Sequence, residues 1–236
     1  MTAARVTRRA LPADLPEAWT GAATWTSAPG GVQPWRLTPA QLEPLPPRGP
    51  RWTVHGSSIT QCNQADSPLG TWPARVAARS SFELTALGLS GQCHLDPPVA
   101  EAIGLSAPDL VTLCLGANIY GAATFTERSL LPAMIGFVEH VRRLTPAPIV
   151  LMSPTTAGPH REDEPNAAGL TQLRIRALIH QGAEILRRHD PGITLIDGAE
   201  IITAEEMHLL GDLLHPTPEG YRVMAERLAP RLSAAL

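Results

Sequence analysis

Three side chains could together activate a hydroxyl group for attack on a carbonyl carbon. Ser58 follows a short apolar run, and Asp212 and His215 stand three positions apart before the last helical segment. A serine hydroxyl is a weak nucleophile unless an imidazole accepts its proton, and the imidazole needs a carboxylate that fixes its tautomer and stabilises its charged form. These residue types therefore predict nucleophilic catalysis, with Ser58 as nucleophile, His215 as general base and Asp212 as its partner.

Two further positions could stabilise the negative charge of a tetrahedral intermediate. The former carbonyl oxygen becomes an oxyanion, which preorganised N–H donors must meet. Gly91 has no Cβ, so a ligand can approach its backbone closely, and Asn118 offers a side-chain NH₂ group. We therefore expect an oxyanion hole formed by the amides of Ser58 and Gly91 and the side chain of Asn118.

The elements that would position these groups are short apolar runs alternating with longer segments of helical periodicity. This alternation is typical of β-α-β units and a parallel sheet. Five runs are short enough to be covered strands: 52–54, 82–87, 110–115, 149–152 and 193–196. The last helix is expected to begin at Thr217 and Pro218, as cap and first-turn residue. The pattern predicts an α/β fold, a three-layer α/β/α sandwich with a five-stranded parallel sheet.

The candidate residues fall at the same edge of this predicted sheet. Ser58, Gly91 and Asn118 follow the first three strands, and the Asp212–His215 pair precedes the last helix. Ligands of open α/β sheets bind outside the carboxyl ends of the strands. The nucleophile, base and oxyanion donors are therefore expected to meet there, as an acyl-transfer site requires.

The length and composition of the chain indicate how it is divided into domains. A length of 236 residues suits one main domain, which we place at 51–236. Residues 1–50 hold nine prolines and three tryptophans, so they cannot form long helices. Because disordered tails are usually poor in aromatic residues, we expect a Pro/Trp-rich arm or small β appendage that lies against the main domain.

The charges exclude several classes of function. Nineteen arginines and no lysines stand against 22 acidic residues, a net charge of −3. There is no basic field to hold nucleic acid or an anionic membrane, and no lysine amine for Schiff-base or pyridoxal chemistry. No apolar run approaches the roughly 20 residues that span a bilayer. Without a secretory signal pattern, we expect a cytoplasmic protein.

Neither a cofactor nor a metal is expected. His94 with Asp96, and His160 with Asp163, are pairs without a third ligand at a suitable spacing. Cys62 and Cys93 follow the first two predicted strands, so a disulfide beside the site is conceivable, although free thiols fit a cytoplasmic setting better.

Four clusters of residues carry these side chains: 55–60 with Ser58, 88–92 with Gly91, 116–119 with Asn118, and 212–216 with Asp212 and His215. In this order they resemble the four signature blocks of the SGNH (Gly-Asp-Ser-Leu type) hydrolases, over residues 51–232. The first block reads Gly56-Ser57-Ser58-Ile59-Thr60, similar to a Gly-Ser-Ser-Ile-Thr branch of that family. The resemblance implies a flavodoxin-like fold and the same roles for Ser58, Gly91, Asn118, Asp212 and His215. Two positions depart from the family pattern, because Ser57 and Ile119 each stand where the family has Asp.

The predicted activity is hydrolysis of carboxylic esters with short acyl groups, such as O-acetyl esters of carbohydrates or small metabolites. Thioester hydrolysis or acyl transfer would use the same groups, and a non-catalytic binding module on the same fold is the alternative outside enzymes. Ser57 and Ser90 are rival serines. However, Ser57 is expected to orient the loop, and Gln92 replaces the second glycine that a Gly-x-Ser-x-Gly elbow around Ser90 would need. The oligomeric state is left open.

Overall fold

The computed structural model describes residues 49–236 of the chain, so most of the Pro/Trp-rich segment predicted as an arm lies outside the described residues. The elements along the described residues are β1 (Arg51–Gly56), α1 (Ser58–Gln61), η3 (Pro68–Gly70), α2 (Trp72–Ser80), β2 (Glu83–Gly88), α3 (Pro97–Leu105), β3 (Leu110–Cys114), α4 (Ala117–Ala122), α5 (Glu127–Leu144), β4 (Ile149–Met152), α6 (Pro159–Asp163), α7 (Gln172–Arg187), β5 (Ile193–Ile196), η4 (Gly198–Glu200), η5 (Ala204–Leu209) and α8 (Pro218–Ser233).

The five strands form one parallel sheet in the order β2-β1-β3-β4-β5. Each predicted apolar run became a strand, with bounds shifted by at most two residues. In β3 and β4 the continuous apolar runs correspond to burial on both faces, because every residue of β4 is buried, as are the first four of β3. The predicted α/β fold with a five-stranded parallel sheet is confirmed.

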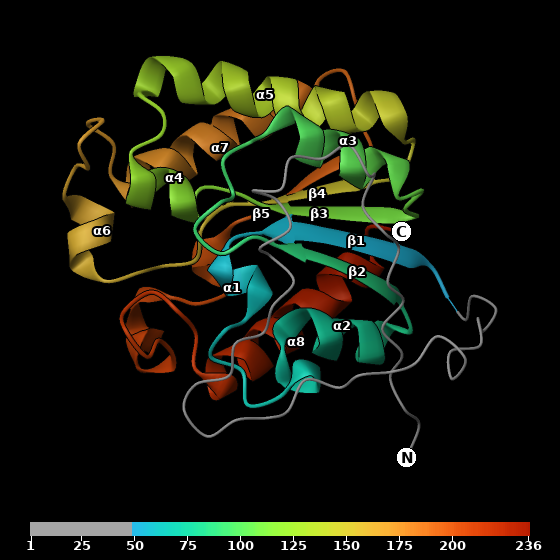
Figure 1. Cartoon of the computed structure of the whole chain (residues 1–236), viewed down its shortest axis with the longest axis horizontal. Helices are drawn as coiled ribbons and strands as arrows, with labels where there is room; N and C mark the ends of the chain where they lie inside the picture. Colours follow the sequence, from blue (N-terminus) through green and yellow to red (C-terminus); the bar gives the residue numbers. More distant parts are fainter. Residues whose placement is uncertain (1–48) are drawn as a thin grey trace.

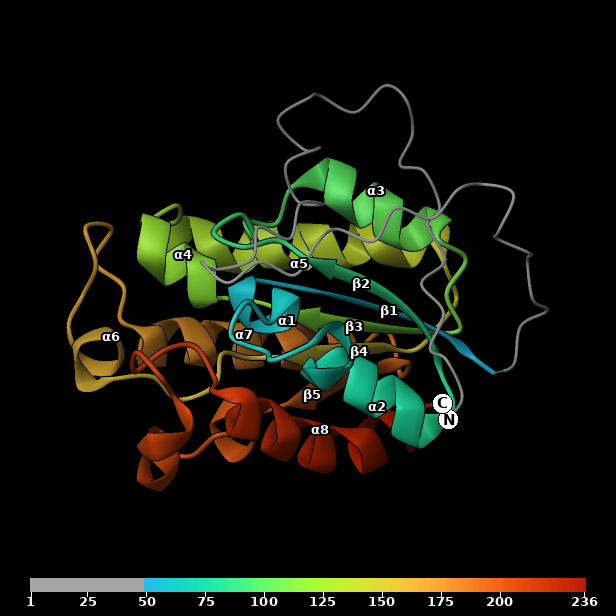
Figure 2. The same cartoon turned by 60° about the horizontal axis from the view of Figure 1, so that its bottom comes forward.

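Helices cover both faces of the sheet (Figure 1). Helices α3, α5 and α7 pack on one face around a cluster that includes Ile103, Val138 and Ile179. Helices α2 and α8 cover the other face, where Figure 2 shows them side by side, around Trp72, Tyr221 and other apolar side chains. The result is the predicted three-layer sandwich.

Local sequence features set the turns at the site end of the sheet. Gly116 links β3 to α4 with φ of 112°, and a Cβ at this position would lie 2.6 Å from Pro154 Cγ. Only glycine meets both requirements. Helix α8 begins as the sequence predicts, because the Thr217 hydroxyl accepts a hydrogen bond from the Gly220 amide and Pro218 occupies the first turn.

The three cysteines are free thiols. Cys62 belongs to the apolar cluster on the α2/α8 face, whereas Cys93 belongs to the cluster on the α3/α5/α7 face. The Cys62–Cys93 disulfide, which the sequence left open, does not form because the sheet lies between the two side chains. Within residues 49–236, no helix is long and apolar enough to cross a membrane.

Candidate active site

Ser58 lies at the first turn of α1, directly after β1. Its neighbour Ser57 caps this short helix: the Ser57 carbonyl accepts the amides of Thr60 and Gln61, and the Ser57 hydroxyl accepts the Ile59 amide. First-turn amides have no partner inside their own helix, so the cap leaves the Ser58 amide available for an oxyanion. Ser57 thus orients the loop, as the sequence suggests, with a hydroxyl where the family pattern has a carboxylate.

Asp212 and His215 lie on a compact loop just before α8. A β-bridge between Leu210 and Pro216 closes the base of the loop. At its tip, Asp212 Oδ1 accepts the backbone amides of His215 at 2.7 Å and Leu214 at 3.1 Å. These two bonds hold the carboxylate against the backbone that carries the imidazole, so the two side chains have a fixed relation before any substrate binds.

The structure brings Ser58, His215 and Asp212 into one hydrogen-bonded chain. His215 Nδ1 lies 2.7 Å from Asp212 Oδ2, and His215 Nε2 lies 2.8 Å from Ser58 Oγ. A carboxylate only accepts, so Nδ1 carries the proton and Nε2 accepts from the Ser58 hydroxyl. Burial opposes ionisation of Asp212, but the hydrogen bonds from the His215 backbone and ring outweigh it and hold the pKa of the carboxyl below its usual value.

Asn118 lies in the first turn of α4, where the Cys93 amide fixes its side chain. Cys93 N donates to Asn118 Oδ1 over 3.0 Å. Because the carbonyl end of the side-chain amide takes this bond, the NH₂ end is the one left for another acceptor. In this orientation the Asn118 NH₂ group could donate a hydrogen bond to an oxyanion.

Gly91 stands in the loop between β2 and α3 with φ of 71°. A Cβ built here would meet nothing within 4 Å, so the position is open to an approaching group. His94 steadies the loop, because its Nε2 lies 2.9 Å from the Gly91 carbonyl oxygen and its Nδ1 lies 2.9 Å from the Thr124 hydroxyl. His94 is thus engaged in loop contacts rather than paired with Asp96.

His55 and Cys93 form a buried contact that the sequence did not predict. His55 Nδ1 lies 2.9 Å from the Leu87 carbonyl oxygen, so it must donate, and Nε2 then accepts from the Cys93 thiol at 3.4 Å. Burial lowers the pKa of His55 to about 4 and raises the pKa of the Cys93 thiol, so both groups are neutral at pH 7. His55 is thus buried and supports the segment whose amide holds Asn118.

Ser90 is tied to the end of α1. Its amide donates to Gln61 Oε1 at 2.9 Å, and its hydroxyl accepts from Asn63 at 3.5 Å. No histidine is among these partners, so of the three serines that the sequence offered, Ser57, Ser58 and Ser90, Ser58 is the one with a described contact to an imidazole. Within the described part of the chain, no three His, Cys, Asp or Glu side chains gather so as to hold a metal ion.

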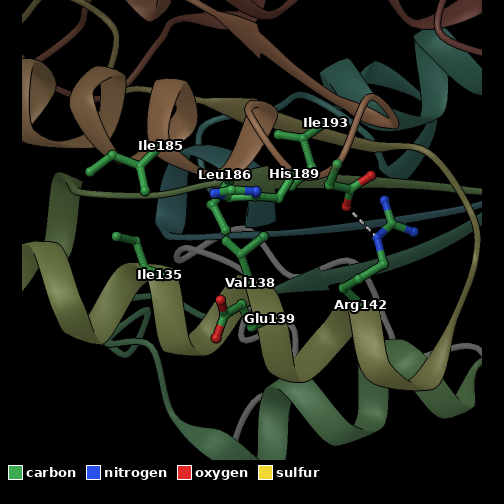
Figure 3. Close-up of a pocket in the computed structure, with 9 residues that line it drawn as sticks. Ile135, Val138, Glu139, Arg142, Ile185, Leu186, His189 and Ile193 are labelled. Carbon is green, nitrogen blue, oxygen red and sulfur yellow. Dashed lines mark hydrogen bonds and ion pairs between the residues drawn. The ribbon is translucent and has the colours of Figure 1, made fainter.

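The pocket drawn in Figure 3 lies apart from this constellation. It is a cavity of about 200 Å³ between α5, α7 and the start of β5, and Ile135, Val138 and Ile193 are among the residues that line it. An ion pair between Arg142 and Asp190, 2.6 Å long, lies at its edge. None of the residues lining this pocket is among those predicted for the site.

Arg161 on α6 is a second residue that the sequence did not single out. Its guanidinium lies over the Tyr120 ring and donates to the Ala117 carbonyl oxygen, next to Asn118. In the sequence it falls in a polar connection after the fourth strand, where nothing distinguishes it from its charged neighbours.

Several solved structures are similar to the chain. A salicylyl-acyltransferase, SsfX3, from a tetracycline biosynthetic pathway is 29% identical with a TM-score of 0.70, and the match covers 79% of this chain and 54% of that one. A protein described as a GDSL-like lipase from Bacteroides ovatus is 23% identical with a TM-score of 0.69, over 80% of this chain and 54% of that one. The chain thus spans about half the length of both.

A carbohydrate acetylesterase family member from Sinorhizobium meliloti has a TM-score of 0.61 at 19% identity, over 80% of this chain and 99% of that one. A comparison with curated protein sequences finds no match. The profile of the GDSL-like lipase/acylhydrolase family matches residues 54–223, which include all four clusters. The chain therefore belongs to the GDSL-like lipase/acylhydrolase family, as the resemblance of its four blocks predicts.

Proposed function

We propose that the protein hydrolyses carboxylic esters of short acyl groups through an acyl-enzyme at Ser58. The observation that carries this proposal is the chain from Ser58 Oγ through His215 to Asp212, with both hydrogen bonds shorter than 3 Å. A serine hydroxyl in contact with an imidazole that a carboxylate orients is the arrangement that activates serine for acyl transfer.

The proposed reaction begins when the Ser58 hydroxyl gives its proton to His215 Nε2 and its oxygen attacks the ester carbonyl carbon. The amides of Ser58 and Gly91 and the NH₂ of Asn118 stabilise the oxyanion. The intermediate then collapses, and the imidazolium of His215 protonates the leaving alcohol. In the second half of the reaction, water gives a proton to His215 Nε2 and its oxygen attacks the acyl carbon. The imidazolium then returns the proton to Ser58 Oγ as the acid leaves.

Short acyl groups fit the polar surroundings of the site better than fatty chains do. In the connection from β4 to α7, the Arg161 side chain lies beside α4, where it donates to the Ala117 carbonyl oxygen next to Asn118. A long acyl chain would need an apolar channel, since each buried methylene gains about 0.8 kcal/mol. The family and the acetylesterase neighbour are consistent with an acetylated carbohydrate or small metabolite as substrate.

A series of p-nitrophenyl esters from acetate to octanoate tests the acyl preference. We expect kcat/KM to be highest for acetate and to fall with chain length, with Ser58→Ala as the blank for spontaneous hydrolysis. Full burial of each methylene would instead raise kcat/KM by about fourfold per carbon, which follows from the transfer energy of about 0.8 kcal/mol. A steady climb to eight carbons would show an acyl channel and refute the short-chain proposal.

Acyl transfer is a second candidate for the same site. It is favoured by the 29% identity to a salicylyl-acyltransferase. Both reactions share the acyl-enzyme and differ in whether water or an alcohol attacks it. Measuring the partition between free acid and new ester with an added alcohol separates them: a hydrolase releases mainly acid, and an acyltransferase mainly ester.

Loss of the Asn118 amide should slow the reaction strongly. We expect Asn118→Ala to lower kcat by roughly 10²–10³, the usual cost of removing one oxyanion donor. Asn63→Ala is the matched control, because Asn63 is an exposed amide whose described partner is Ser90. Steady-state kinetics with p-nitrophenyl acetate give the comparison. Full activity in Asn118→Ala would remove this side chain from the oxyanion hole.

A further inference from the structure

A guanidinium held in one position borders the proposed catalytic site. Arg161 Nη2 donates to the Ala117 carbonyl oxygen over 2.7 Å, and Nε donates to Gln172 Oε1 over 3.2 Å. Its central carbon lies 4.4 Å from the centre of the Tyr120 ring. Two hydrogen bonds and a stacked ring fix the plane of the group, so little conformational entropy remains to be lost when it binds a ligand.

The positive charge of Arg161 is not matched by an ion pair within the described part of the chain. The two carboxylates whose charge acts on Arg161 have other cationic or imidazole partners: Glu162 binds Arg176 through both oxygens, and Asp212 binds His215. Burial lowers the pKa of Arg161, opposed in part by Tyr120, Glu162 and Asp212. A partly buried cation held only by neutral groups would gain from an anionic ligand.

The location of Arg161 links it to both halves of the proposed site. Ala117, which accepts its Nη2, directly precedes Asn118 on α4. On the other side, the Gly158 amide, just before α6, donates to the Leu213 carbonyl oxygen over 2.7 Å. Leu213 belongs to the loop that carries His215. Arg161 therefore lies between the element that presents the Asn118 amide and the loop that presents the base.

One end of the guanidinium is left for a ligand. The bonds to Ala117 and Gln172 use Nε and one N–H of Nη2, which leaves the N–H groups of Nη1 and one of Nη2. Nη1 lies 3.8 Å from the place where a Cβ of the exposed Gly121 would be, so no side chain from that residue covers it. Two adjacent nitrogens of a guanidinium match the two oxygens of a carboxylate or phosphate.

We propose that Arg161 binds an anionic group of the ester substrate and thereby makes the enzyme selective for negatively charged esters. This inference rests on the proposed function, because it assigns the substrate of the same site. The anionic group stands on the acyl part or on the alcohol part of the ester, and the two positions are separated by the choice of substrates.

Two matched pairs of esters test the inference. In the alcohol arm, 4-carboxyphenyl acetate is compared with its neutral analogue 4-carbamoylphenyl acetate. In the acyl arm, the p-nitrophenyl monoester of succinic acid is compared with the p-nitrophenyl ester of succinamic acid. The measured quantity is kcat/KM for the anionic ester divided by that for its neutral analogue, in the full chain and in Arg161→Gln, Arg161→Lys and Arg143→Gln.

We expect Arg161→Gln to lower this ratio in one arm by about tenfold to a hundredfold, the usual effect of losing a hydrogen bond to a charged group. Arg161→Lys, which keeps the charge without the planar fork, should retain part of the ratio. Arg143→Gln removes one positive charge at the exposed end of α5 and should leave the ratio unchanged. This control separates a local contact from a change in net charge.

Two outcomes would overturn the inference: an unchanged ratio in both arms, with or without a parallel loss of kcat/KM for charged and neutral esters, or an equal change in Arg143→Gln. A parallel loss would mean that Arg161 only supports the position of α4. The proposed function is judged separately, by whether the unaltered chain hydrolyses p-nitrophenyl acetate and Ser58→Ala does not. An unaltered chain inactive toward every ester would refute both proposals.

Discussion

Ser58→Ala is expected to abolish ester turnover and covalent labelling by a fluorophosphonate, and His215→Ala to reduce turnover by roughly 10⁴-fold or more. Ser58 Oγ lies 2.8 Å from His215 Nε2, so the hydroxyl can lose its proton as it attacks. Without the imidazole the hydroxyl is a weak nucleophile at neutral pH. Intact-mass measurement after labelling, together with steady-state rates on p-nitrophenyl acetate, checks both effects.

Two neighbouring serines provide the controls for this experiment. Ser57 caps α1, and the described partners of Ser90 are Asn63 and Gln61. Ser57→Ala and Ser90→Ala should therefore still be labelled. Labelling that persists in Ser58→Ala would refute the assignment of the nucleophile, and an unlabelled, inactive parent protein would support a binding module on the same fold.

Glu162→Ala is expected to lower the free energy of unfolding by about 3–5 kcal/mol, the usual cost of leaving one partner of a buried ion pair without the other. Glu162 and Arg176 have side chains that are 14% and 8% exposed and are joined by bonds of 2.9 and 3.0 Å. Glu162 also accepts the Ala157 amide and the Gln172 side chain. Its loss would therefore leave buried donors unpaired in the connection beside the His215 loop.

An exposed pair nearby provides the comparison. Arg174 and Glu127 form an ion pair with side chains 44% and 60% exposed, so Glu127→Ala should cost at most about 1 kcal/mol. Urea denaturation of both variants gives the two values. If Glu162→Ala cost no more than Glu127→Ala, Arg176 would have to find compensation elsewhere, for instance from Asp197, whose Oδ1 lies 3.7 Å from Arg176 Nε.

The sequence by itself determined the fold class and the order of the strands along the chain. Strands of a covered parallel sheet are apolar on both faces, so β3 and β4 read as short continuous apolar runs between helical segments. The start of α8 was also predictable, because Thr217 and Pro218 act through neighbouring backbone. Such features depend on a few consecutive residues and need no knowledge of distant contacts.

The candidate triad could be proposed from the sequence because the chemistry of each type is restrictive. A serine, an Asp-x-x-His pair and donors beside glycines are the parts of an acyl-transfer site, and they seldom occur together by chance. A parallel sheet brings the carboxyl ends of its strands to one edge, so residues that follow different strands can meet there. The sequence could not give the distance between Ser58 and His215, which are 157 residues apart. That distance depends on how α1 and the loop before α8 pack at the same edge of the sheet.

Only the tertiary structure decided which other side chains and backbone amides contact the proposed catalytic residues and their neighbours. The Cys93 amide orients Asn118, 25 residues away, and Arg161 reaches the Ala117 carbonyl across 44 residues. Cys62 and Cys93 both follow strands, yet they lie on opposite faces of the sheet. Such contacts leave no local pattern, because a hydrogen bond between distant segments depends on the packing of whole helices and loops and not on the residues next to it in the chain.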